Sequence, residues 1–117
     1  MTPMDNDLRA ALLDVVAVAV VLRPSIIAQP RREATLVAHR DRLTRARLRM
    51  MGGELCEARR AGLDLAKACE EALACCDLDQ DPLSALEAVA RHTASVERLV
   101  PDHVPSSVAD WTKNPIV

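Results

Sequence analysis

The sequence predicts an all-α fold, a four-helix up-and-down bundle with a short C-terminal helical turn. Three long segments carry apolar residues at three- and four-residue spacing, the period of an amphipathic helix. The run at residues 15–22 is apolar throughout; its valines also suit a buried strand, but no other segment resembles a partner strand. A chain of 117 residues suits one domain with a single core. We expect residues 1–100 to form the bundle and residues 101–117 an irregular tail whose short helix packs on it.

The first helix is expected to begin at Thr2 and to end before Pro24. Thr2 is a typical N-cap and Pro3 suits the first helical position. Because proline lacks an N–H and clashes with the preceding turn, Pro24 predicts that the helix ends at Leu22. Residues 23–30 would then form a connector.

The second helix is expected from residue 30 or 31 to residue 50 or 51. Its apolar residues form two stripes, which predicts contacts with two neighbouring helices. Gly52 and Gly53 predict its end. The first stripe contains Leu36, His39, Leu43, Ala46 and Met50, and the second contains Val37, Thr44, Leu48 and Met51.

The third helix is expected over residues 54–77 and the fourth from Pro82 to about residue 100. The third has one wide apolar stripe that begins at Leu55, and its Gly62 permits a close approach of another helix. Asp81 is a typical cap for the fourth helix, whose inward stripe begins at Leu83. The spacing of Asp77, Asp79 and Asp81 imitates a calcium loop, but the glycine and glutamate that such a loop requires are missing.

The apolar first helix predicts a homodimer. A helix that is apolar on every side needs protein all round it, and one bundle normally leaves each helix a face in water. A second copy of the chain would cover that face. The predicted dimer interface contains Leu12, Val15, Val16, Val18, Ala19, Val20, Val21 and Leu22.

An arginine stripe on the second helix supports an alternative function. Arg31, Arg42, Arg45 and Arg49 share one face and match a phosphate backbone, which would make the chain a nucleic-acid-binding accessory protein. The same charges can instead pair within the molecule, in particular with the acidic third helix. The net charge of −2 implies no bulk attraction to nucleic acid.

Cysteine and histidine support a second alternative, a thiol or metal-binding bundle. In an antiparallel hairpin His39 would face Cys69, yet a metal site needs at least three ligands. Cys75 is expected on the charged face and is the candidate reactive thiol. We expect no cofactor and no bound metal.

Trp111 is the single aromatic residue and either fixes the tail to the bundle or anchors a protein partner. The chain lacks a phosphate-binding loop, a dinucleotide fingerprint and a catalytic triad. Its acidic N-terminus differs from a secretory signal, and the apolar run is too short to span a membrane. We therefore predict a non-catalytic, cytoplasmic protein–protein interaction module, such as a regulator, adaptor or inhibitor subunit, that acts as a homodimer.

Overall fold

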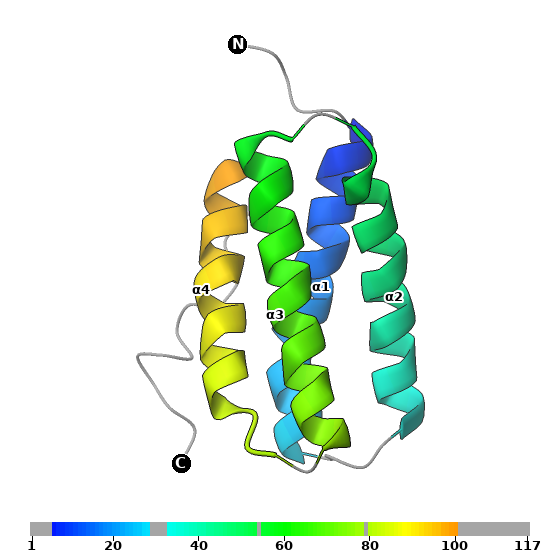
Figure 1. The fold of residues 1–117 in the computed structure, drawn as a ribbon, viewed down its shortest axis with the longest axis vertical. Helices are drawn as coiled ribbons and strands as arrows, with labels where there is room; N and C mark the ends of the chain where they lie inside the picture. Colours follow the sequence, from blue (N-terminus) through cyan, green and yellow to red (C-terminus); the bar gives the residue numbers. More distant parts are fainter. Residues whose placement is uncertain (1–5, 29–32, 54, 79, 101–117) are drawn as a thin grey trace.

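The computed structural model describes residues 6–28, 33–53, 55–78 and 80–100. These ranges form four helices and no strand, so the predicted all-α class is confirmed. Consecutive helices run in opposite directions (Figure 1), as in an up-and-down bundle. The predicted cap at Thr2 and the predicted helix in residues 101–117 lie outside the described residues. The helices are α1 (Asn6–Ala28), α2 (Glu33–Met51), α3 (Glu57–Asp77) and α4 (Leu83–Leu99).

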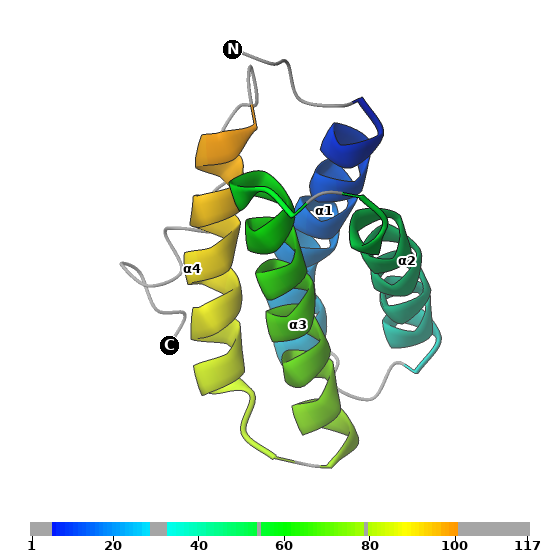
Figure 2. The same cartoon turned by 45° about the horizontal axis from the view of Figure 1, so that its top comes forward.

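The four helices pack as a rhombus in cross-section. Helices α1 and α3 each contact the three other helices, whereas the described parts of α2 and α4 do not contact each other. Figures 1 and 2 show α2 and α4 on opposite sides of the α1–α3 pair. Ala19 of α1 and Ala66 of α3 are completely buried. Small side chains of this kind allow α1 and α3 to approach across the short diagonal.

Helix α1 continues through Pro24, so the predicted end at Leu22 is wrong. A proline inside a helix costs about 3 kcal/mol because it removes one hydrogen bond and crowds the preceding turn. The extra turn places Ile26 in the core, where it is buried, and burial of such a side chain contributes about 1.5–3 kcal/mol. The Ser25 Oγ also donates a 2.7 Å hydrogen bond to the Val21 carbonyl oxygen. Tertiary packing therefore offsets most of the local penalty.

Helix α2 ends at Met51, as the two glycines predict. Gly53 has a φ of +118°, a backbone conformation that residues other than glycine rarely adopt. The Arg59 side chain from the next helix caps the end of α2: its Nη1 donates to the carbonyl oxygens of Met50 at 2.7 Å and Gly52 at 2.8 Å. This cap satisfies carbonyl groups that the helix leaves without a partner.

The starts of α3 and α4 differ from the expected ones in detail. Helix α3 begins at Glu57 with Cys56 as its N-cap, three residues after the predicted start, so Leu55 lies outside the helix and is exposed. Helix α4 begins at Leu83 with Pro82 as its N-cap residue, one residue later than predicted, although the Asp81 Oδ1 accepts a 3.0 Å hydrogen bond from the Leu83 N–H. The Leu83 side chain is exposed, although it was expected in the inward stripe. Leu55 precedes its helix, so the helical period does not set its direction, whereas Leu83 is the first residue of α4 and lies at the end of the bundle (Figure 1).

Candidate functional site

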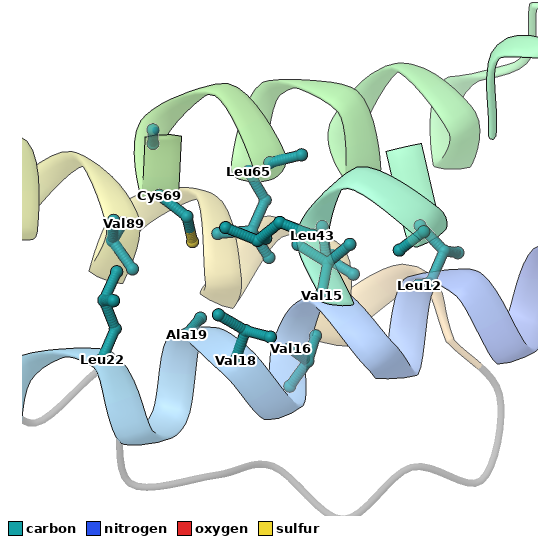
Figure 3. Close-up of a cluster of buried hydrophobic side chains, with 14 of the residues drawn as sticks. Leu12, Val15, Val16, Val18, Ala19, Leu22, Leu43, Leu65, Cys69 and Val89 are labelled. Carbon is teal, nitrogen blue, oxygen red and sulfur yellow. The ribbon is translucent and has the colours of Figure 1, made fainter. Parts of the chain in front are cut away.

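The predicted dimer interface on α1 lies largely inside one chain. Six of its eight residues are buried (Figure 3), packed with Leu43 of α2, Leu65 of α3 and Val89 of α4. Val20 is half-buried and the Val21 side chain is 42% exposed. The premise that one chain cannot enclose this helix is therefore wrong. The six buried residues are Leu12, Val15, Val16, Val18, Ala19 and Leu22.

Gly62 explains how α1 becomes enclosed. A methyl group at this position would overlap the side chains of Leu12 on α1 and Met50 on α2. Three helices therefore meet at a residue without a side chain, which confirms the close approach predicted for Gly62. The resulting contact across the diagonal covers a side of α1 that a square bundle leaves open.

The arginine stripe forms ion pairs with α1. Arg42 contacts Asp14 at 2.9 Å, and Arg49 contacts Asp7 at 2.7 Å and Asp14 at 3.4 Å. The hydrogen bond to Asp7 raises the pKa of Arg49, and the charges of Asp7 and Asp14 act in the same direction. Arg31 lies outside the described residues. Two of the four guanidinium groups are therefore already bound to carboxylates.

Two further arginines of α2 pair with the acidic third helix. Arg40 contacts Asp77 at 2.6 Å, and Arg47 contacts Glu70 at 3.0 Å. These four side chains are about one-third to one-half exposed, and exposed ion pairs contribute about 0–1 kcal/mol each. Asp77 therefore takes part in an ion pair, and Asp81 accepts a hydrogen bond from the first residue of α4.

His39 contacts α1. Its Nε2 lies 3.4 Å from the Ser25 Oγ, and burial together with the charge of Arg42 lowers its pKa. Cys69 is completely buried in the core, where burial raises the pKa of its thiol to about 12. At neutral pH this thiol stays protonated, which disfavours both metal ligation and nucleophilic attack. Among the described residues no three His, Cys, Asp or Glu side chains form a group that could hold a metal ion.

The four cysteines are free thiols in different environments. Cys75, the candidate reactive thiol, is half-buried and lines an open groove of about 410 Å³ between α3 and α4. Burial and the neighbouring Cys75 raise the pKa of Cys76. Cys56 is exposed, and its Sγ accepts a 3.4 Å hydrogen bond from the Arg59 N–H. Sequence reasoning missed Cys56 because the third helix was expected to begin before it.

The second stripe of α2 is exposed along its whole length. The exposed fractions are 52% for Val37, 64% for Leu48 and 61% for Met51. The two-stripe pattern is therefore real, but only its first stripe packs against other helices. We call this surface the outer face of α2 and define it as Val37, Asp41, Thr44, Arg45, Leu48 and Met51, all of which are exposed.

An open groove of about 580 Å³ between α2 and α3 adjoins the outer face of α2, because Met51 lines both. Leu63 and Ala74 of α3 also line it, together with the charged residues Arg47, Asp64, Lys67, Glu70 and Glu71. The groove therefore combines apolar residues with a charged surround. Exposed apolar surface rimmed by polar residues is typical of protein interaction sites.

No protein-family model matches the chain, and comparisons with curated proteins and with solved structures gave no match. None of the described helices combines the length and the apolar content needed to cross a membrane. Trp111, the candidate partner anchor, lies outside the described residues.

Proposed function

We propose that this chain is a non-catalytic protein–protein interaction module that binds its partner through the outer face of α2. The observation that carries the proposal is the exposure of Val37, Leu48 and Met51, each more than half accessible, on one side of a single helix. Full burial of such a side chain from water gains about 1.5–3 kcal/mol, and because each of the three is already partly covered, roughly half of that is forfeited at each. A partner that covers them would recover part of this free energy.

A regulator, adaptor or inhibitor subunit would bind in this way, by steric contact of a helix face with a groove or another helix. The proposal includes the cytoplasmic location expected from the sequence, which the four free thiols support. The ion pairs of Arg42 and Arg49 with α1 favour this interpretation over nucleic-acid binding, because their guanidinium groups already contact carboxylates.

The test compares two leucine substitutions on different faces. Leu48→Glu places a charge on the outer face of α2, whereas Leu83→Glu makes the same change at an exposed leucine at the start of α4. We expect the tagged wild-type chain and the Leu83→Glu variant to retain a stoichiometric protein from cell extract. Leu48→Glu should bind that protein at least tenfold more weakly, a loss of about 1.4 kcal/mol.

The identity of the retained protein distinguishes the forms of the proposal. Either another protein or a further copy of this chain would support an interaction module. Equal retention by both variants would show that a different surface binds. Retention of no protein at all would contradict the proposed function.

A further inference from the structure

We propose that the partner of the outer face of α2 is a second copy of this chain, and that the two α2 helices pair antiparallel. The inference rests on the proposed function, since it uses the same surface, and it names the occupant. The predicted homodimer interface is therefore placed on α2, whose outer-face apolar residues are exposed, and no longer on α1, whose apolar residues are mostly buried.

The outer face of α2 carries exposed charges of opposite sign that can pair with a second copy of the same face. Asp41 and Arg45 lie beside Leu48 on one flank of the outer face, and both are exposed. In the described part of the chain neither of them forms an ion pair; the Arg45 Nε only reaches the Asp41 backbone carbonyl oxygen at 3.4 Å. This flank therefore presents one acid and one base that are available to a partner. By contrast, carboxylates of α1 or α3 bind four other arginines of α2, namely Arg40, Arg42, Arg47 and Arg49.

Symmetry then selects the antiparallel arrangement. A two-fold axis perpendicular to two antiparallel helices brings the same flank of each helix together, so that Asp41 of each copy meets Arg45 of the other. A two-fold axis parallel to the helices places these flanks on opposite sides, and the charges cannot meet. The antiparallel pair thus forms two equivalent ion pairs.

The apolar residues fit the same register. When Asp41 lies opposite Arg45 of the second copy, Val37 lies opposite a position only one residue away from Leu48 of that copy. The two-fold symmetry repeats this contact. Thr44 lies near the centre of the contact. On the opposite flank Arg40 and Arg47 are already paired with Asp77 and Glu70 of their own chain, which reduces repulsion between the copies.

The decisive experiment is disulfide cross-linking under mild oxidation. In a full-length chain with Cys56, Cys75 and Cys76 changed to Ser, a Val37→Cys variant is mixed with a Leu48→Cys variant. We expect a covalent dimer from the mixture only. In a pair of Leu48→Cys chains the two introduced thiols would lie about 15 Å apart along the antiparallel axes, beyond the roughly 7 Å between Cα atoms that a disulfide spans. The serine background alone is the control.

Sedimentation of the purified chain tests the charge argument. We expect a dimer, at least tenfold weaker association in Asp41→Arg because two ion pairs become repulsive contacts, and recovery in Asp41→Arg/Arg45→Asp. If Asp41→Arg weakened association only because it misfolded, the second substitution in the double variant would not restore association. Cross-linking of Leu48→Cys with itself would indicate a parallel pair and would overturn the proposal.

A chain that sediments as a monomer at high concentration would also overturn this inference. If the wild-type monomer still bound a different protein and the Leu48→Glu variant did not, the proposed function would stand and only the second copy would be rejected as the partner. If the thiol introduced by Leu48→Cys were shielded from a maleimide in a monomer, residues 101–117 of the same chain would be the occupant, and the dimer would again be rejected.

Discussion

Helices α1 and α2 each carry apolar residues on more than one side, yet the fold covers them very differently. On α1 the apolar surface contacts α2, α3 and α4, and all but its outermost edge is buried. On α2 one stripe contacts α1 and α3 while the second stays in water. The difference comes from position, because α1 lies on the short diagonal of the rhombus and α2 at an end of the long one.

The apolar residues of α1 thus stabilise the fold, whereas those on the outer face of α2 are available for binding. A buried valine of α1 and an exposed leucine of α2 look alike in a hydrophobicity profile. Their surroundings assign the first to the core and the second to a surface that a partner can contact.

The largest expected difference is between equal truncations on the two helices. Leu12→Ala should lower the free energy of unfolding by about 2–5 kcal/mol, because Leu12 is completely buried and the mutation leaves a cavity. Leu48→Ala should change it by less than about 0.5 kcal/mol when measured at low protein concentration, where association contributes little. Urea unfolding of both variants measures the difference. Equal losses would show that the outer face of α2 belongs to the folded core.

A smaller effect is expected where α1, α2 and α3 meet. Gly62→Ala gains about 1 kcal/mol in helix propensity but forces Leu12 and Met50 to move within a filled core, which costs about 1–3 kcal/mol. The net loss should be about 1 kcal/mol in urea unfolding. Gly52→Ala is the control, since nothing lies within 4 Å of its added methyl group. A stabilised Gly62→Ala variant would show that the diagonal contact is looser than described.

The smallest expected effect concerns the contact between α1 and α2 at His39. Burial and the charge of Arg42 lower the pKa of His39 below its usual value of 6.5. His39 therefore binds a proton more readily in the unfolded chain than in the folded one. Its effect is to lower the free energy of unfolding as the pH falls from about 6.5 through the pKa of the folded state, and above about pH 6.5 this loss is absent. Urea unfolding at about pH 7 and about pH 5 should show this loss, and His39→Gln should reduce it. An unchanged loss in the variant would assign it to other groups.

Much of the fold is predictable from local patterns. The three amphipathic periods, the Gly52-Gly53 turn and the contact of Asp81 with the start of α4 each depend on residues that are close in sequence, and the structure has all of them. The end of α1 was mispredicted because local reasoning included the penalty of Pro24 but not the burial of Ile26. The Arg59 cap was missed because it joins a side chain of one helix to the end of another.

The candidate site was only half predictable. The two stripes of α2 follow from the helical period, but the period cannot tell which stripe meets a neighbour. In the same way the arginine positions indicated a charged face, whereas their pairing with Asp7 and Asp14 of α1 depended on which helix lies beside them.

The sequence by itself determined the helices, their turns and the faces of each helix, because hydrogen bonding, capping and periodicity act over a few residues. Only the tertiary structure decided which apolar face is enclosed. The small residues of α1 and α3, with Gly62 at the tightest point, let these two helices approach across the bundle. That approach covers α1 and leaves the outer face of α2 exposed to water, where a partner can reach it.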